Sequence, residues 1–287
     1  MRAEIAEAVE RIRGDLEHGA RELALEAVRA LRTIADGCQG EALRQAAREL
    51  ALARPMMAAV TNALAAAWAA VVEAGGSLQP LDEIIQRLEE APRHMTEAGR
   101  GLLPEGTVMT YSYSSTVIEV LGQARPQRTI ISEARPRNEG LRTARHLAEK
   151  GISVTLITEA QMGLFVREAE AVVVGADTIF PDGSLVNKIG TRLLALAARD
   201  AGVPFYVLSE TLKVSALSAP KRFVAEEGNR KEVSKESWLR VRNVYFEVAP
   251  ARLVTAYITE EGVFKPEELR RYADEAERRW RLLMGQT

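Results

Sequence analysis

The sequence predicts an α/β fold in which an N-terminal all-helical domain is followed by a Rossmann-like doubly wound parallel sheet. Three observations lead to this prediction. Residues 1–103 show only helical apolar spacing, short β-rich runs alternate with helical patterns after Pro104, and the run 171–174 is entirely apolar. A continuous apolar run of that length is typical of a strand buried on both faces of a parallel sheet. We therefore expect a helical domain over 1–103 and an α/β domain over 104–287.

The first hundred residues read as a series of helices. Apolar residues recur at helical spacing in five segments, and Pro or Gly interrupts the pattern between several of them. These segments are 5–16, 23–34, 41–53, 56–74 and 80–90. The fourth segment is rich in Ala, and such small side chains let helices approach closely. A compact helical bundle is expected.

Six β-rich runs follow Pro104. They are 107–111, 129–132, 153–158, 171–174, 204–208 and 253–259. Helical patterns over 140–150 and 187–200 lie between them, and a last one covers 266–283. Strands that alternate with helices of this length indicate right-handed βαβ units on a parallel sheet.

The composition narrows the class of protein. A net charge of −2 argues against a general nucleic-acid binder, and the most apolar window, 63–72, is too short to span a bilayer. The N-terminus lacks the apolar core of a signal peptide, and the single cysteine, Cys38, cannot form an internal disulfide. We expect a cytoplasmic protein that contacts neither a membrane nor nucleic acid. The three scattered histidines show no metal-site spacing, so neither a metal nor an organic cofactor is expected.

The segment 175–191 carries the most chemical information. Asp177 follows the apolar run, which places its carboxylate at the carboxyl end of a buried strand, where open α/β sheets bind ligands. After a tight turn at Asp182-Gly183, Asn187 and Lys188 begin a new helical pattern. An amide, an ammonium and free N–H groups at a helix start would bind an anion. An ordinary strand, turn and capped helix explains the same residues.

Two other strand ends are polar. The run 109–116 contains Ser112, Ser114 and Ser115, and hydroxyls at a helix start either cap the helix or hold a phosphate. Such a run of hydroxyl residues exceeds what a cap needs, which favours phosphate binding. After the run 204–208, Lys213 offers a second ammonium for a dianionic phosphate.

Taken together and in this order, these motifs resemble one superfamily. It joins the alpha, beta and delta regulatory subunits of translation initiation factor 2B to methylthioribose-1-phosphate isomerase and ribose-1,5-bisphosphate isomerase. The resemblance covers nearly the whole chain. It rests on Ala53-Arg54-Pro55, on 110–114, on Glu133–Pro136, on Gly-Ala-Asp at 175–177 with Asn-Lys-Ile-Gly-Thr at 187–191, and on 209–213.

The resemblance assigns roles to individual residues. It implies that a sugar-phosphate pocket is lined by Arg54, Ser114, Ser115, Asn187, Lys188 and Lys213. The isomerases place an Arg-Gly-Ala element on the substrate, which reads His18-Gly19-Ala20 here. They also use a Cys after Thr-His, opposite the Asp that corresponds to Asp177. This chain has Thr110-Tyr111-Ser112 at those positions, so Ser112 stands where the catalytic thiol would be.

Three functions remain open on this evidence. A serine hydroxyl is far less acidic than a thiol, whose ordinary pKa is about 8.5, which favours a protein that binds a phosphorylated pentose or a nucleotide without thiol-dependent catalysis. Retention of Asp177 favours the alternative, an aldose–ketose isomerase of a ribose 1-phosphate-type sugar phosphate in which Asp177 and Ser112 are the catalytic pair. The third is a subunit whose main role is assembly. The resemblance implies a homodimer or a higher homo-oligomer in every case.

Overall fold

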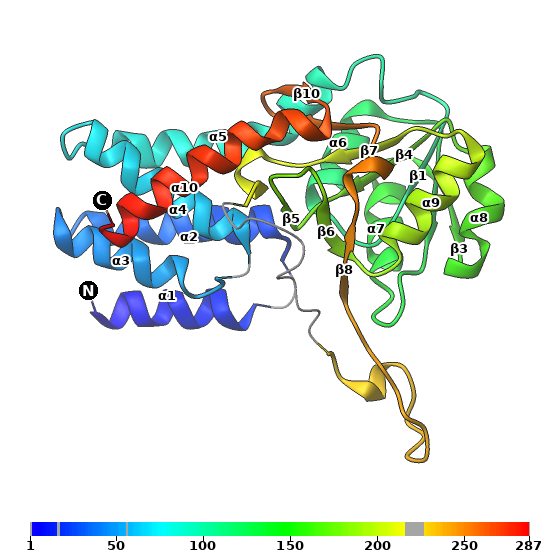
Figure 1. The fold of residues 1–287 in the computed structure, drawn as a ribbon, viewed down its shortest axis with the longest axis horizontal. Coiled ribbons are helices and arrows are strands. Elements are labelled where there is room, and N and C mark those ends of the chain that lie inside the picture. The colour runs from blue at the N-terminus through cyan, green and yellow to red at the C-terminus, as the bar shows by residue number, and fades with distance from the viewer. Residues whose placement is uncertain (1, 16–17, 56, 216–226, 287) are drawn as a thin grey trace.

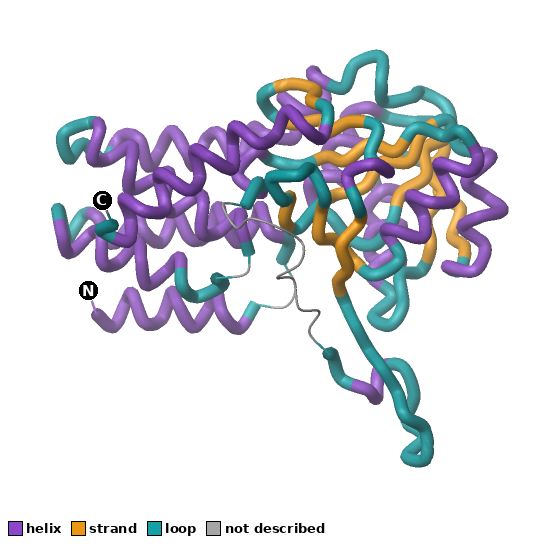
Figure 2. Tube along the Cα trace, viewed as in Figure 1, coloured by secondary structure: helices purple, strands orange, loops and turns teal. Residues whose placement is uncertain are grey.

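The chain folds into a layer of long helices beside an α/β sheet region (Figure 1; Figure 2). A computed structural model describes residues 2–15, 18–55, 57–215 and 227–286. The predicted α/β class, with N-terminal helices and a doubly wound sheet, is confirmed. In the described part of the chain, no helix combines the length and apolarity that a bilayer span requires.

Five helices form the N-terminal layer. They are α1 (Arg2–Gly14), α2 (Ala20–Ala35), α3 (Glu41–Ala51), α4 (Ala58–Glu73) and α5 (Gln79–Ala98). The Ala-rich α4 is central and almost wholly buried, because its small side chains allow α2, α3 and α5 to pack against it. The C-terminal helix α10 (Arg270–Met284) also lies against α4, and its Leu283 is buried in the helical core (Figure 1). The end of the chain therefore returns to the N-terminal layer.

The main sheet has seven strands in the order β10-β9-β7-β4-β1-β2-β3. Their bounds are β1 Thr107–Thr110, β2 Arg128–Ser132, β3 Ser153–Ile157, β4 Ala171–Gly175, β7 Phe205–Leu208, β9 Ala256–Thr259 and β10 Gly262–Phe264. All neighbours pair in parallel except β10, which is antiparallel to β9. Each of the six predicted β-rich runs overlaps one of the parallel strands, with bounds that differ by up to three residues.

Helices cover both faces of this sheet. They are α6 (Ser115–Ala124) and α7 (Glu139–Glu149) with α5 on one face, and α8 (Met162–Phe165) and α9 (Thr191–Ala201) on the other. Alternate residues of each strand point to opposite faces, so Val108 and Val173 pack beneath α6 while Met109 and Val174 pack beneath α9. The strand order reverses between β1 and β4, which pair directly. Such a reversal is where doubly wound sheets open toward ligands.

A second, antiparallel sheet corrects the sequence prediction. It consists of β5 (Thr178–Ile179), β6 (Leu185–Lys188) and β8 (Phe246–Ala249). The turn at Asp182-Gly183 is present, but it joins β5 to β6, and Asn187 and Lys188 belong to β6 rather than to a helix start. The helix α9 begins at Thr191. Its first amides are occupied, because Glu247 Oε1 accepts from Gly190 N at 2.7 Å and Arg192 N at 3.0 Å. The predicted anion site at that helix start is therefore wrong.

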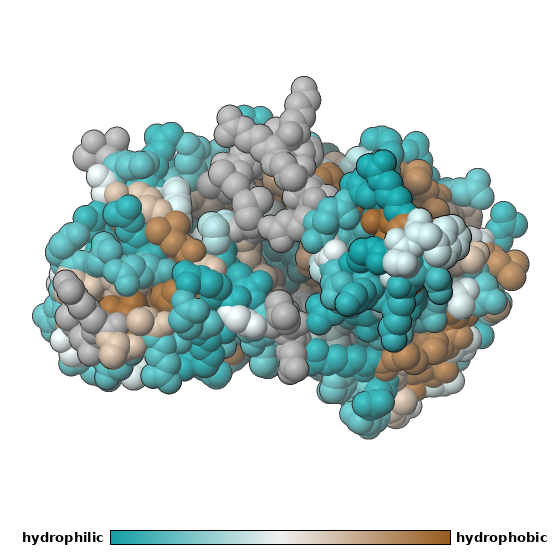
Figure 3. All heavy atoms as spheres, turned by 90° about the horizontal axis from the view of Figure 1, so that it is seen from below, coloured by the Kyte–Doolittle hydropathy of each residue, from teal (hydrophilic) through white to brown (hydrophobic). Residues whose placement is uncertain are grey.

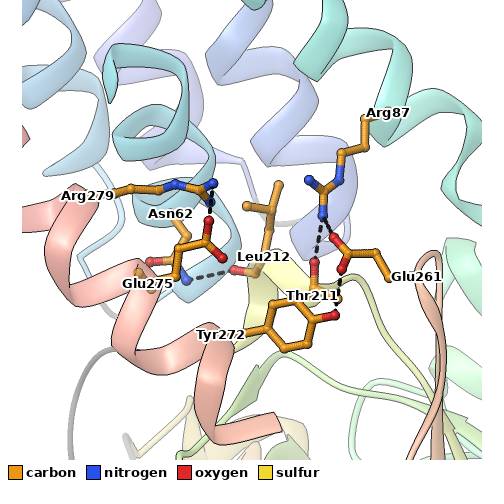
Figure 4. A pocket seen from close by; sticks show the side chains of 9 residues that line it. Asn62, Arg87, Thr211, Leu212, Glu261, Tyr272, Glu275 and Arg279 are labelled. Carbon is orange, nitrogen blue, oxygen red and sulfur yellow. Dashed lines mark hydrogen bonds and ion pairs between the residues drawn. The ribbon is translucent and has the colours of Figure 1, made fainter. Parts of the chain in front are cut away.

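A short helical turn, η3 (Thr211–Lys213), joins the sheet to the helical layer. Leu212 inserts into the helical core, and Asn62 of α4 donates from its amide to Leu212 O at 2.8 Å and Val214 O at 2.7 Å. On the same side, Arg87 of α5 contacts Thr211 Oγ1 at 2.8 Å (Figure 4). The turn that carries Lys213 is thus fixed by two helices.

We expect Asn62→Ala to lower the free energy of unfolding by about 1–3 kcal/mol, because two buried carbonyls would lose their donor. Gln45→Ala is the control, since Gln45 is exposed and its amide contacts only Glu49; a change within about 0.5 kcal/mol is expected. Urea unfolding of both variants measures this. Equal effects of the two substitutions would contradict a stabilising role of the Asn62 hydrogen bonds to η3.

Candidate functional site

The predicted residues gather at the carboxyl edge of the main sheet, beside the reversal in strand order. Ser112 follows β1 and Asp177 follows β4, and these two strands are paired neighbours. The two strand ends touch: a Cβ on Gly175, the last residue of β4, would lie only 2.7 Å from Ser114 Oγ. Glycine is therefore needed at position 175. We refer to Ser112, Ser114, Ser115, Asp177, Lys188 and Lys213 as the edge site.

The turn after β1 holds Ser112 in an unusual conformation. Ser112 is buried and has a φ of 61°, in the left-handed region that non-glycine residues seldom adopt. Its carbonyl accepts a hydrogen bond from Thr143 Oγ1 of α7 at 2.7 Å, which fixes this geometry. Left-handed backbone costs on the order of 1 kcal/mol or more, and such strain concentrates at functional sites. The hydroxyl of Ser112 is placed at the strand end at the expense of stability.

The starts of α2 and α6 lie together. Ser114 caps α6 by accepting from Val117 N at 3.3 Å, so capping accounts for this one hydroxyl of the run. Gly19 precedes α2, and Ala20 begins that helix. A Cβ added to Gly19 would lie 3.7 Å from Ser115 Oγ. The first N–H groups of a helix have no partner within it. Gly19 N already donates to Glu22 Oε2 at 2.9 Å, so the groups left for a phosphate or carboxylate are the following N–H groups of α2, the first ones of α6 and the Ser115 hydroxyl.

The charges of two ammonium groups act on Asp177. Burial raises the pKa of Asp177, and the charges of Lys213 and Lys188 only partly oppose this. Each lysine is bound to a glutamate instead: Lys188 Nζ to Glu139 Oε1 at 2.6 Å and Lys213 Nζ to Glu210 Oε2 at 2.8 Å. The Asp177 carboxyl itself makes no hydrogen bond to any residue the structure describes. It is thus an acid that keeps its proton to higher pH than an exposed aspartate, and it is available to a ligand.

Tyr111, which directly follows β1, has a structural role. Its hydroxyl donates to Ile189 O at 2.5 Å, and its ring leaves no room for a Cβ at Gly190, whose φ is 103°. Burial and nearby carboxylates raise the pKa of Tyr111 further above its ordinary value. Tyr111 therefore fixes the corner between β6 and α9 and is unsuited to exchanging protons near neutral pH.

The other predicted residues lie on the borders of this region. Asn187, in β6, donates from its amide to Thr191 Oγ1 at 3.0 Å. Arg54 follows α3 and binds the end of α1 through Ile12 O at 3.0 Å and the carbonyl of Asp15. Arg54 thereby holds the carboxyl end of α1.

Sequence reasoning missed the acids that organise the lysines. Glu210 is 1% exposed and accepts from Thr116 Oγ1 at 2.7 Å, and Arg21 Nε lies 3.7 Å away. Burial alone would raise the pKa of Glu210, but Lys213, Arg21 and Thr116 together hold it below its usual range. Glu210 lies inside the motif 209–213, so the sequence drew attention to its position. Its partners come from α2 and α6, and nothing in the sequence indicated that pairing.

One residue of a projecting segment also reaches this region. Residues 227–245 run out from β8 as an arm (Figure 1). At its base, Lys188 Nζ lies 5.4 Å from the centre of the Tyr245 ring, and the Tyr245 hydroxyl donates to Glu232. The arm therefore packs on the outer side of Lys188.

A small polar cavity lies on the reverse side of η3 (Figure 4). It measures about 60 Å³, and its charged groups already bind one another: Arg87 pairs with Glu261, and Arg279 with Glu275. We assign it to the support of the turn, because it is lined by Thr211 and Leu212 of η3 and contains no residue of the edge site.

Comparison with known proteins gives the family. Residues 16–266 match the Initiation factor 2 subunit family. The chain belongs to this family. It is 37% identical over 283 residues to ribose 1,5-bisphosphate isomerase of Archaeoglobus fulgidus, covering 92% of this chain and 90% of that protein.

Solved structures agree with this assignment. The structure is similar to that of translation initiation factor eIF-2B from Pyrococcus horikoshii, with a TM-score of 0.77, 32% identity and coverage of 92% of this chain and 98% of that one. It is also similar to 5-methylthioribose 1-phosphate isomerase of the same organism, with a TM-score of 0.72, 25% identity and coverage of 96% and 87%. Membership of this family confirms the resemblance drawn from the motifs.

We expect Asp177→Asn to raise the free energy of unfolding at pH 7. A native pKa above the unfolded value of about 3.9 means that the native state binds more protons, so the wild type loses stability as pH rises through this interval. The gain from the substitution should shrink toward pH 4, where both states become protonated. Asp200→Asn, at an exposed site, is the control. Urea unfolding at the two pH values tests this, and a variant less stable than wild type at pH 7 would contradict it.

Proposed function

We propose that this chain binds a phosphorylated pentose or a nucleotide at the edge site and does so without thiol-dependent catalysis. The observation that carries the proposal is the meeting of the α2 and α6 starts at Ser115 and Gly19, with Lys213 and Lys188 beside Asp177. Helix starts and hydroxyls suit the phosphate, and the carboxyl and ammonium groups suit sugar hydroxyls. The family's isomerase members, by name, act on such compounds.

The missing thiol supports binding over turnover. Ser112 occupies the position of the isomerase cysteine, and no histidine precedes it. The only cysteine, Cys38, is buried in the helical core, and burial raises the pKa of its thiol. A serine needs a strong base beside it to lose its proton. Its neighbour Tyr111 is bound to the Ile189 carbonyl and does not supply that base.

One observation favours a second candidate, an aldose–ketose isomerase of a ribose 1-phosphate-type compound such as ribose 1,5-bisphosphate or methylthioribose 1-phosphate. Asp177 is held as a raised-pKa acid with no hydrogen-bond partner in the described part of the chain, which binding alone does not require. In this case Asp177 would move the proton between adjacent carbons, with Ser112 opposite it.

A ligand panel with Ser112→Cys separates these functions. Ribose phosphates, methylthioribose 1-phosphate and nucleoside monophosphates are first screened by thermal stabilisation, and a ligand at a hundredfold over its Kd adds about 2.7 kcal/mol. NMR then follows conversion. We expect the wild type to bind without conversion and Ser112→Cys to gain ketose formation, whereas Ser77→Cys, which adds an exposed thiol elsewhere, should not.

Three outcomes of this experiment are informative. If the wild type converts a ligand and Asp177→Asn does not, the proposed function would be isomerisation instead of binding alone. Binding by the wild type with no conversion by either cysteine variant would leave the binding function standing. Stabilisation by none of the ligands would contradict both functions.

We also propose that the chain forms a homodimer. The α9 helix exposes Leu193 and Leu196, and the adjacent β8 exposes Phe246. The face in Figure 3 is largely hydrophilic, but hydrophobic atoms gather toward its lower right, on the side of the sheet region. Exposed apolar groups of this kind favour association. Light scattering should give twice the chain mass at micromolar concentration, and a monomer mass there would contradict the dimer.

A further inference from the structure

The buried carboxylate of Glu210 has no role in the ligand site as described so far. It leaves the end of β7, one residue after Ser209, and contacts groups from three elements. These are Lys213 Nζ of η3 at 2.8 Å, Thr116 Oγ1 of α6 at 2.7 Å and Arg21 Nε of α2 at 3.7 Å. Arg21 is itself shared with Glu119 of α6. An anion with this many partners and 1% exposure is held in one position.

Lys213 has two acids within its reach, and it binds one of them. Asp177 is near enough for the charge of Lys213 to act on it, together with that of Lys188 from β6. The ammonium of Lys213 nevertheless pairs with Glu210, and that of Lys188 pairs with Glu139 of α7. Leu208 at the end of β7 pairs with Gly175 at the end of β4, and Glu210 and Asp177 each follow by two residues. Without Glu210, a lysine that is 3% exposed would be left with Asp177 as the acid across this strand pair. A buried ammonium needs such a partner.

We propose that Glu210 is a positioning residue: its carboxylate holds the Lys213 ammonium at the end of β7 and keeps it from pairing with Asp177. Both groups then remain separately available, the ammonium to a ligand phosphate and the carboxyl to a ligand hydroxyl or carbon-bound proton. This role has a purpose only if the proposed function holds, but the arrangement of Glu210 and Lys213 does not depend on any ligand.

The test is an NMR titration of Asp177 in protein labelled at aspartate carboxyl carbons, with the signal identified by its loss in Asp177→Asn. In Glu210→Gln we expect the Asp177 midpoint to move to lower pH, because Lys213 turns to it. The matched control is Glu260→Gln. The side chain of Glu260 is nearly as buried, at 4% exposed against 2% for Glu210, and it binds the same turn through Thr211 and Arg87 rather than through Lys213, so the midpoint should stay in place.

A second background separates positioning from simple repulsion between the two carboxylates. If Glu210 acts through Lys213, Glu210→Gln should move the midpoint in the wild type but not in Lys213→Gln. An equal movement in both backgrounds, or no movement in either, would overturn the proposal. The double variant removes both charges of the pair, so it keeps the test possible should Glu210→Gln alone fail to fold.

Ligand affinity distinguishes this proposal from the function on which it draws. With ribose 5-phosphate as probe, Glu210→Gln should weaken binding by about tenfold, the effect of one lost charged hydrogen bond, and Glu260→Gln should not. Absence of any binding by the wild type would count against the proposed function while the Asp177 titration still decides the role of Glu210. Normal binding with an unmoved midpoint would overturn the role of Glu210 alone.

Discussion

The buried ion pair of Glu210 and Lys213 is the constraint on which the arrangement of the site depends. A charge so far from solvent is costly unless its partners stay in place. Its partners belong to α2, α6 and η3, so the helical layer and the sheet edge are held in one relative position. The contacts of Asn62 and Leu212 act in the same direction from the other side of η3. Polar and apolar contacts thus hold the same turn.

Within this fixed arrangement, Ser112 and Asp177 are held in energetically unfavourable states. Ser112 is held in left-handed backbone, and Asp177 has neither a hydrogen bond within the described residues nor an ion pair of its own. Groups of this kind lower stability and persist only where the surrounding structure determines them. A phosphorylated ligand would compensate them with its own charge and hydroxyls.

The sequence was sufficient for the elements whose stability is local or repetitive. Short β-rich runs located the parallel strands, and helical spacing located α1 to α5 within a few residues at most ends. The second sheet was not predictable in this way, because β5 and β6 are two and four residues long and β8 joins them some 60 positions later. The sequence therefore predicted that Asn187 and Lys188 begin the following helix, whereas they belong to β6. The candidate site residues were proposed from the order of motifs along the chain, whereas the pairing of Lys188 with Glu139 and of Lys213 with Glu210 became evident only from the fold.

The most direct test of the central claim is a map of backbone amide shifts on adding ribose 5-phosphate to uniformly ¹⁵N-labelled protein. If the edge site receives the phosphate, the largest changes should fall on the starts of α2 and α6, at residues 19–21 and 114–116. Smaller changes should follow at 177 and 213. Saturable shifts confined to the cavity behind η3, around Arg87 and Arg279, would contradict this account, as would shifts confined to the arm at 227–245.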